Sequence, residues 1–279
     1  MPPRSREVTR LAVRVYAAVR VVPRAPIVSS DCAGLLALRG VRVGFRQGGR
    51  AGLILEDVSL EVDAGQTVAV VGQRWEGKTT LLRVAAGMEL AEDGQVLFEG
   101  VDFASRSRRK RARLLGRDIV WLDRTESGLG LTMLDYLGLP LVMGWRGPRR
   151  AQVRRMAADA LERVGVAHIA RSRPQALSSW ERVLVGLASA IVVRPKLLLV
   201  DDLLDALGTS RTLQAGDLLN SLAGEFGFGV LFSVSEIDSA IMADRVLAFE
   251  QRTLRLMADH HPQEAAILEF PRTASGGQE

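Results

Sequence analysis

The stretch Thr67–Leu82, TVAVVGQRWEGKTTLL, decides the fold of this chain. It begins with the apolar run TVAVV, which predicts a short buried strand. Gly72 and Gly77 bound a turn, and the helix-compatible run KTTLLRVAAGM follows. A buried strand that passes through a glycine-bounded turn into a helix is typical of an α/β fold.

The turn has the spacing G-x-x-x-x-G-K-[ST] between Gly72 and Thr79. In this motif the backbone N–H groups at the start of the helix face phosphate, because the helix dipole favours an anion there. Lys78 would neutralise phosphate charge, and the Thr79 hydroxyl would bind Mg²⁺. We therefore expect ATP and Mg²⁺ as cofactors. The predicted nucleotide-binding residues of the loop are Gly72, Gln73, Arg74, Trp75, Glu76, Gly77, Lys78, Thr79 and Thr80.

Two residues inside this loop are unusual for a phosphate cradle. Trp75 adds bulk to a turn that must wrap around a ligand, and Glu76 adds a carboxylate beside a polyphosphate. Like charges in a partly desolvated site weaken binding. That penalty disappears if the Glu76 side chain points away from the ligand, and the Arg74 charge can also offset it.

Composition restricts the classes of protein. The 279 residues are 47% hydrophobic and 25% charged, as in an ordinary globular protein with a substantial core. No apolar run approaches the roughly 20 residues that a membrane-spanning helix needs. Cys32 is the only cysteine, so we expect no internal disulfide and a reducing compartment. The net charge of +5 suits anionic lipid or nucleic acid without establishing either.

The first 35 residues differ in character from the rest. Arginines interrupt their apolar run, which is not the pattern of a secretory signal. On a helical projection the arginines gather on one side and apolar residues on the other. The segment is therefore either an amphipathic helix on an acidic membrane surface or an extension without stable structure. The arginines concerned are Arg6, Arg10, Arg14, Arg20 and Arg24.

From Leu36 onward, strand and helix patterns alternate. LALRGVRVGF and LILEDVSLEV predict an antiparallel layer, while DIVWLD, KLLLVDD and VLFSVS predict further buried strands. Between Thr132 and Val193 the pattern is mostly helical. The fold class is therefore α/β, with an antiparallel β subdomain and an inserted helical subdomain. The predicted parts are an extension at 1–35, a domain at 36–257 with its helical subdomain at about 124–192, and a tail at 258–279.

The run SRSRRKRARLLGR, residues 105–117, is strongly basic. It predicts the solvated face of a helix, and contact with lipid or nucleic acid is the alternative.

From Leu36 to Leu256 the chain resembles the nucleotide-binding subunit of ABC transporters. The phrases LTMLDYLGLPL and RPKLLLVDD are most similar to the lipoprotein-release and macrolide-export type. The resemblance implies a P-loop NTPase core and head-to-tail pairing with a second nucleotide-binding domain, as a homodimer or heterodimer. It also implies a separate membrane permease, contacted near Thr132–Val142, and a peripheral place on the cytoplasmic face of the cell membrane.

The resemblance also assigns roles outside the loop. Phe45 would stack on adenine, and Asp123 would take the place of the Q-loop glutamine near Mg²⁺. Asp201 would hold the Mg²⁺ water shell. Asp202 stands where the family has a catalytic glutamate, and it is one methylene shorter. Ser235 stands where the family has a histidine that contacts the γ-phosphate.

The signature motif of the family, LSGGQ, reads LSSWE at Leu177–Glu181. Ser178 remains a candidate phosphate contact, but Trp180 should obstruct the close approach that glycine permits. A Ser followed three residues later by Glu also predicts a capped helix. We expect Trp75 and Trp180 to face one another across the ATP slot of a dimer, or else to be unrelated substitutions. Gly208 stands where the family has the D-loop aspartate.

Three functions follow from these patterns. The first is an ATP-binding subunit that couples nucleotide binding, with weak or no hydrolysis, to a permease. The alternative is a catalytically inactive subunit that pairs with an intact ATPase. Nucleic-acid binding is disfavoured, because the basic run contains no aromatic residues.

Overall fold

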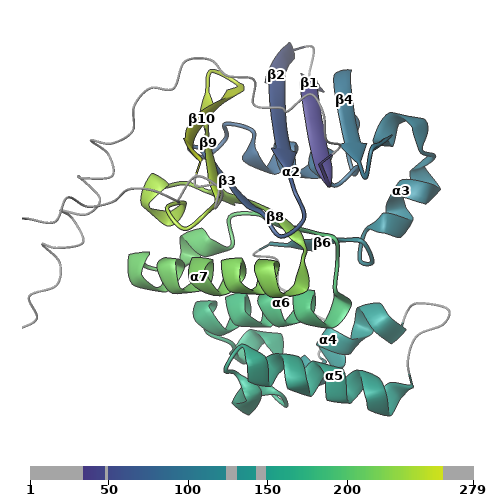
Figure 1. The fold of residues 1–279 in the computed structure, drawn as a ribbon, viewed down its shortest axis with the longest axis vertical. Helices are drawn as coiled ribbons and strands as arrows, with labels where there is room; N and C mark the ends of the chain where they lie inside the picture. Colours follow the sequence, from purple (N-terminus) through teal and green to yellow (C-terminus); the bar gives the residue numbers. More distant parts are fainter. Residues whose placement is uncertain (1–33, 48–49, 124–130, 143–148, 260–279) are drawn as a thin grey trace, which may run out of the picture.

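The computed structural model describes residues 34–47, 50–123, 131–142 and 149–259 (Figure 1). The expected N-terminal extension, apart from its last two residues, lies outside the described part. Nearly all of the expected C-terminal tail does too. Strand β10 continues through Asp259, two residues beyond the expected end of the domain.

Two sheets organise the molecule. The first is antiparallel, with the strand order β2-β1-β4-β5. It forms because β1 and β2 alternate buried apolar with more exposed residues and pair in antiparallel register as far as Gln47 with Arg50. The predicted antiparallel layer is confirmed. Its strands are β1 (Leu36–Gln47), β2 (Arg50–Val62), β4 (Asp93–Phe98) and β5 (Val101–Asp102).

The second sheet has six strands in the order β10-β9-β3-β8-β7-β6. All neighbouring pairs in it are parallel except β9 with β10. Strand β3, which leads into the quoted loop, lies between β8 and β9. The strands are β3 (Thr67–Val71), β6 (Ile119–Leu122), β7 (Leu197–Val200), β8 (Gly229–Val234), β9 (Arg245–Glu250) and β10 (Thr253–Asp259).

Helices cover the six-stranded sheet and extend away from it. In Figure 1, α6 and α7 lie below the sheet, and α4 and α5 lie below α6. The α-helices are α2 (Lys78–Ala85), α3 (Arg108–Leu114), α4 (Met133–Val142), α5 (Arg150–Arg163), α6 (Ser179–Val193) and α7 (Thr209–Phe226). Short 3₁₀ turns are η1 (Phe103–Ser105), η2 (Ala167–Ile169), η3 (Pro174–Ala176), η4 (Leu204–Ala206) and η5 (Ile237–Ser239).

Two hydrophobic clusters lie on opposite faces of the parallel sheet. Because side chains alternate along a strand, Ala69 and Val71 of β3 face one cluster and Val68 and Val70 face the other. The first cluster joins the sheet to α4–α7, and the second joins it to α2 and the antiparallel sheet. The fold is the mixed α/β architecture that the sequence predicts. Within the described ranges, no helix has the length and apolar character to cross a membrane.

Candidate functional site

The loop from Gly72 to Gly77 joins the buried strand β3 to helix α2. The Gly72 N–H donates to the Val234 carbonyl at 3.1 Å, which ties the loop to the end of β8. Gly77 has a φ of 105°, and a Cβ there would lie 2.9 Å from Ile54 Cγ2, so the position requires glycine. Gly77 is the N-cap of α2 and supplies no side-chain cap. The first N–H groups of α2 therefore remain without a side-chain acceptor, as an anion site needs.

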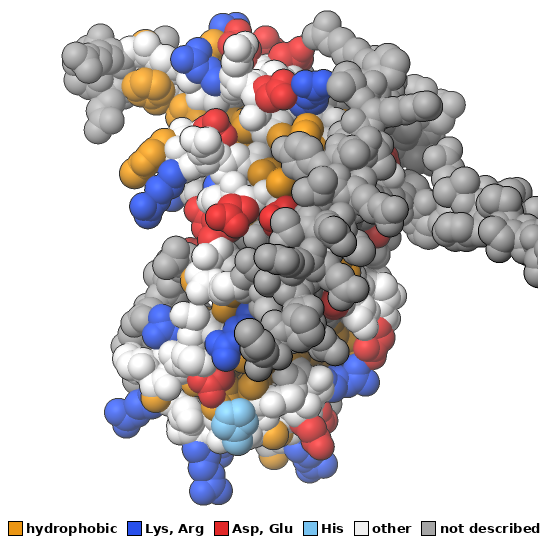
Figure 2. Space-filling view, turned by 90° about the vertical axis from the view of Figure 1, so that its left-hand side faces the viewer, with side chains coloured by type: hydrophobic (Ala, Val, Ile, Leu, Met, Phe, Trp, Pro, Cys, Tyr) orange, Lys and Arg blue, Asp and Glu red, His pale blue; other side chains and the backbone are white. Residues whose placement is uncertain are grey.

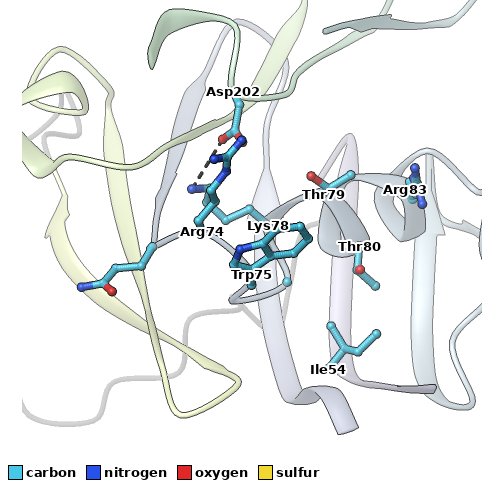
Figure 3. A pocket seen from close by; sticks show the side chains of 10 residues that line it. Ile54, Arg74, Trp75, Lys78, Thr79, Thr80, Arg83 and Asp202 are labelled. Atoms are coloured by element: carbon cyan, nitrogen blue, oxygen red, sulfur yellow. Dashed lines mark ion pairs between the residues drawn. The ribbon is translucent and has the colours of Figure 1, made fainter. Parts of the chain in front are cut away.

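A cavity of about 410 Å³ opens beside this loop. Figure 3 shows Lys78, Thr79 and Thr80 at the start of α2 on one side of it and Asp202 on another. Its size is within the range of small-molecule sites. The residues that line it are Ile54, Gln73, Arg74, Trp75, Gly77, Lys78, Thr79, Thr80, Arg83 and Asp202.

Lys78 is the central cation of the site. Its side chain is only 4% exposed, and its Nζ donates to the Gly72 carbonyl at 2.5 Å and to Ser235 Oγ at 3.1 Å. The same Nζ lies 3.4 Å from Asp202 Oδ1, the ion pair drawn in Figure 3. A buried ammonium needs such partners. The chain therefore holds the lysine in place with its own oxygen atoms.

The Glu76 carboxylate does not occupy the cavity. Its Oε2 accepts a hydrogen bond from the Gln73 N–H at 2.6 Å, and the residue is absent from the cavity lining. The same oxygen would lie 2.8 Å from a Cβ at Gly72, so the carboxylate folds back over the start of the loop. It thus closes the turn from outside, and the repulsion expected between Glu76 and a polyphosphate is avoided.

Trp75 projects from the loop into solvent. Its backbone φ is 75°, a left-handed conformation that is rare for a residue with a side chain. The residue is 94% exposed, although its indole lines the cavity (Figure 3). Such a conformation is unfavourable by about 1–3 kcal/mol, so the surrounding loop must impose it.

Asp201 follows β7 and lies beneath the start of α2. It accepts hydrogen bonds from Ser233 Oγ at 2.9 Å and from the Thr79 side chain. Burial raises the pKa of this carboxyl, the two hydroxyl hydrogen bonds lower it, and the charges of Asp202 and Asp123 raise it further. The Asp201 carboxylate and the Thr79 hydroxyl are two adjacent hard oxygen donors. Among the described residues, no three His, Cys, Asp or Glu side chains lie close enough together to hold a metal ion by themselves.

A network of hydrogen bonds extends from Lys78 to a residue that the sequence patterns did not single out, Asp205. Ser235 donates its hydroxyl to Asp205 Oδ2 at 2.6 Å and its N–H to Asp205 Oδ1 at 3.0 Å. Asp202 has a φ of 48°, and its N–H donates to Ser233 Oγ at 2.9 Å. The site thus combines the ends of β7 and β8, which are neighbours in the sheet.

Asp123 and Phe45 are among the predicted residues that lie outside the cavity lining. Asp123 accepts a hydrogen bond from Trp121 Nε1 at 3.2 Å, and its charge reaches Asp201. Phe45 is 44% exposed, and its ring covers Gly52 on the neighbouring strand, where a Cβ would lie 2.6 Å away. Its surface is open to a flat ligand.

On the face shown in Figure 2, acidic side chains gather at mid-height, where the outline narrows.

The LSSWE segment lies at the start of α6 and has its polar groups paired with one another. Ser178 Oγ accepts from the Glu181 N–H at 3.3 Å, and Glu181 Oε2 accepts from the Ser178 N–H at 2.8 Å. Hydrogen bonds from Ser178 lower the pKa of Glu181. The predicted helix cap is confirmed. Trp180 is half-buried and packs against the cluster that joins the sheet to α4–α7.

The family model described as ABC transporter matches residues 55–204, which include the loop, the LSSWE segment and Asp201. The chain belongs to the ABC transporter family.

Two curated ABC relatives align over most of their length. The aliphatic sulfonates import ATP-binding protein SsuB of Mycobacterium avium (strain 104) is 40% identical over 199 residues, covering 71% of this chain and 72% of the relative. SsuB 3 of Pseudomonas syringae pv. syringae (strain B728a) is 34% identical over 222 residues, covering 79% and 75%. The dimeric ATP-binding cassette MJ0796, solved with ADP and Pi, has the same fold. It has a TM-score of 0.72 at 21% identity and covers 80% of this chain and 99% of that one.

The expected ABC type was wrong. We expected the lipoprotein-release and macrolide-export type, whereas these relatives are named for aliphatic sulfonate import. The phrases that suggested it belong to α4 and β7, whose buried apolar residues include Met133, Leu137 and Leu197–Val200. Packing dictates an apolar pattern in such segments, so they distinguish poorly between transporter types.

Some of the predicted ABC site residues lie together around one cavity, and others lie elsewhere. The loop residues from Gln73 to Thr80 other than Glu76, together with Asp202, line one cavity, and Ser235 reaches it through Lys78. Ser178 belongs to the cap of α6 instead. The patterns missed Ile54, Arg83, Ser233 and Asp205. Ser233 and Asp205 reach the site because β7 and β8 are neighbours in the sheet. Spacing along the chain does not reveal that two strands are neighbours.

Proposed function

We propose that this ABC domain is the ATP-binding subunit of a membrane importer, that it binds Mg·ATP, and that it hydrolyses ATP slowly or not at all. The single observation that supports nucleotide binding is the cavity beside the uncapped start of α2, with buried Lys78 at its base. Binding would exchange the internal partners of Lys78 for phosphate oxygens. Trp75 and Glu76 do not fill this space.

Magnesium fits the Thr79–Asp201 pair. Mg²⁺ prefers hard oxygen ligands and retains several waters, so one hydroxyl and one carboxylate beside bound phosphates are sufficient. When bound, Mg²⁺ would neutralise phosphate charge. Burial, the largest cause, raises the pKa of Asp201, and a bound cation would favour its charged form. Thr79 and Asp201 would hold the ion, and the charge of Asp123, which acts on Asp201, would add to its attraction.

Slow hydrolysis follows from the placement of Asp202 and Ser235. The Asp202 side chain is one methylene shorter than the glutamate of the family, so its carboxylate would lie farther from an attacking water. Ser235 directs its hydroxyl proton to Asp205. An attacking water must be placed within about 1 Å, and a displacement of that size can slow a reaction on the order of a hundredfold. Neither side chain is placed to position that water well.

The LSSWE segment favours pairing with a second nucleotide-binding domain that carries an intact signature. In this chain the Ser178 hydroxyl and the Glu181 carboxylate bind each other, and Trp180 packs into the core. A second candidate function is therefore a catalytically inactive subunit in a heterodimer with an intact ATPase. In either case the permease would contact the region near Thr132–Val142 and hold the subunit at the inner face of the cell membrane.

The decisive experiment is to titrate the purified chain with Mg·ATP and to measure phosphate release. Saturable binding with turnover well below about 1 s⁻¹ supports slow hydrolysis, since typical enzymes turn over at 1–10³ s⁻¹. Turnover in that ordinary range that disappears in Asp202→Asn contradicts it. Absence of ATP binding contradicts the whole proposal. Turnover restored by adding a second ABC domain favours the heterodimer.

Import of aliphatic sulfonates is the transport reaction to test first, because the relatives are named for it. Deletion of the gene should abolish growth on an alkanesulfonate as the sole sulfur source and leave growth on sulfate intact. Equal growth on both sulfur sources would refute that substrate class, while ATP binding by the purified chain would remain as a separate result.

A further inference from the structure

Helix α3 carries a dense group of exposed cations. It spans Arg108–Leu114, contains no buried residue, and lies at the edge of the molecule beyond the β4 end of the antiparallel sheet (Figure 1). We call its exposed cations the α3 basic face. The face consists of Arg108, Arg109, Lys110 and Arg113.

The charges at the start of this face do not stabilise the helix that carries them, whereas Arg113 lies in the last turn, where the helix dipole favours a cation. The first turn of α3 contains no acidic residue and begins with Arg108, although the helix dipole favours negative charge there. Arg109 and Arg113 are four residues apart and repel each other across one turn. Ser107 caps the helix, and Leu114 packs against the second core cluster. The helix is therefore held by its ends, while the cations of its first turn oppose it.

The neighbouring arginines show how a structural cation behaves in this segment. Arg111 is partly buried and donates hydrogen bonds to the carbonyls of Gly87 and Arg106. Arg117 pairs with Asp118. In the described part of the chain, no side chain of the α3 basic face forms a salt bridge or hydrogen bond. These four cations are exposed and have no ionic partner among the residues that the structure describes.

We propose that the α3 basic face binds the anionic phospholipid headgroups of the membrane beside the permease. The inference rests on the proposed function, which places the subunit at a membrane. The face suits a lipid surface because four unpaired cations on less than two turns match a sheet of negative headgroups. Residues 104–117 contain no aromatic side chain on which a nucleobase could stack, which disfavours nucleic acid. Figure 1 shows α3 toward the same side of the molecule as α4, where the permease contact is proposed.

The test is co-sedimentation of the full chain with vesicles of phosphatidylcholine alone or of phosphatidylcholine with phosphatidylglycerol. We expect binding to the anionic vesicles only, and we expect about 0.5 M NaCl to abolish it because salt screens the attraction. The quadruple variant of the face should bind on the order of a thousandfold more weakly. It is R108Q/R109Q/K110Q/R113Q.

A matched control removes the same number of charges elsewhere. Its four arginines are exposed and lie outside α3, so it should bind anionic vesicles within about threefold of the unaltered chain. It is R155Q/R171Q/R173Q/R252Q.

Three outcomes would overturn the proposal. The first is that the quadruple variant binds anionic vesicles as tightly as the unaltered chain does. The second is that the control variant loses as much affinity as the quadruple variant. The third is that α3 binds single-stranded RNA and not vesicles. Mg·ATP binding is measured on the same preparations, and the quadruple variant should retain it. Failure of ATP binding in the unaltered chain would contradict the proposed function, whereas failure of vesicle binding alone would contradict only the lipid contact.

Discussion

The dipeptide Trp-Glu occurs before α2, at Trp75-Glu76, and again at the start of α6, at Trp180-Glu181. In both places the Glu carboxylate folds back to accept a hydrogen bond from the N–H three residues earlier, at 2.6 Å in the loop and 2.8 Å in α6. The shared spacing gives the same local bond. Each glutamate therefore accepts a hydrogen bond from a backbone N–H of its own turn and does not face a ligand.

The tryptophans differ. Trp75 is 94% exposed on a left-handed backbone, whereas Trp180 is half-buried against the core on a regular helix. The expectation that both indoles project into one ATP slot is therefore not supported for Trp180. The loop keeps an open cavity despite its substitutions. The LSSWE segment has become a well-capped helix start, with its hydroxyl and carboxylate already paired.

The largest expected effect belongs to the loop. Lys78→Ala should weaken Mg·ATP binding at least a hundredfold, because it removes the buried cation that would contact phosphate and leaves Asp202 unpaired beside it. Isothermal titration calorimetry measures the change. Ser178→Ala serves as the control and should leave ATP binding by the single chain unchanged. Equal weakening by both variants would show that the two regions do not differ as described.

The next effect separates the tryptophans by stability. Trp180→Ala should lower the free energy of unfolding by about 2 kcal/mol, because it removes a half-buried ring from the core. Trp75→Ala should change it by less than about 0.5 kcal/mol, because that ring contacts mainly solvent. Urea denaturation of both variants provides the measurement. A larger loss for Trp75→Ala would reverse the comparison.

The cap of α6 should contribute less. Ser178→Ala should lower the free energy of unfolding by about 1 kcal/mol. Glu181 has a lowered pKa, so its contribution is present above its ordinary value of 4.5 and is lost as the pH falls through its lower folded value. The stability difference between the chain and Ser178→Ala should therefore shrink in acid. A stability difference that stays constant from pH 7 to pH 3 would show that the ionised Glu181 carboxylate does not contribute to the cap.

The smallest effect has the opposite sign. Asp201 has a raised pKa, so its ionisation destabilises the folded chain without ligand at neutral pH, and this penalty disappears as the pH falls toward 3.8. Asp201→Asn should therefore raise the free energy of unfolding by under about 1 kcal/mol at pH 7 and remove the Mg²⁺ dependence of ATP binding. Thermal melting at pH 7 and pH 4 tests the sign. A lower melting temperature for Asp201→Asn at pH 7 would contradict it.

Much of the fold followed from the sequence because local signals agreed. The run TVAVV, the glycines at 72 and 77, and the Ser178–Glu181 spacing each define a local structure that the molecule adopts. The Ser235–Asp205 contact was not predictable, because it joins residues 30 positions apart through the pairing of two strands. The direction of Glu76 was also open, since spacing places a residue on a turn but does not select its rotamer.

The exposed position of Trp75 has a practical consequence. An indole in contact with water emits at long wavelength, and this one lies at the rim of the cavity. Nucleotide entering beside it, or a second subunit closing over it, would shield the ring and shift its emission to the blue. Trp75 is one of four tryptophans in the chain, so the shift that depends on it is the one that Trp75→Phe removes.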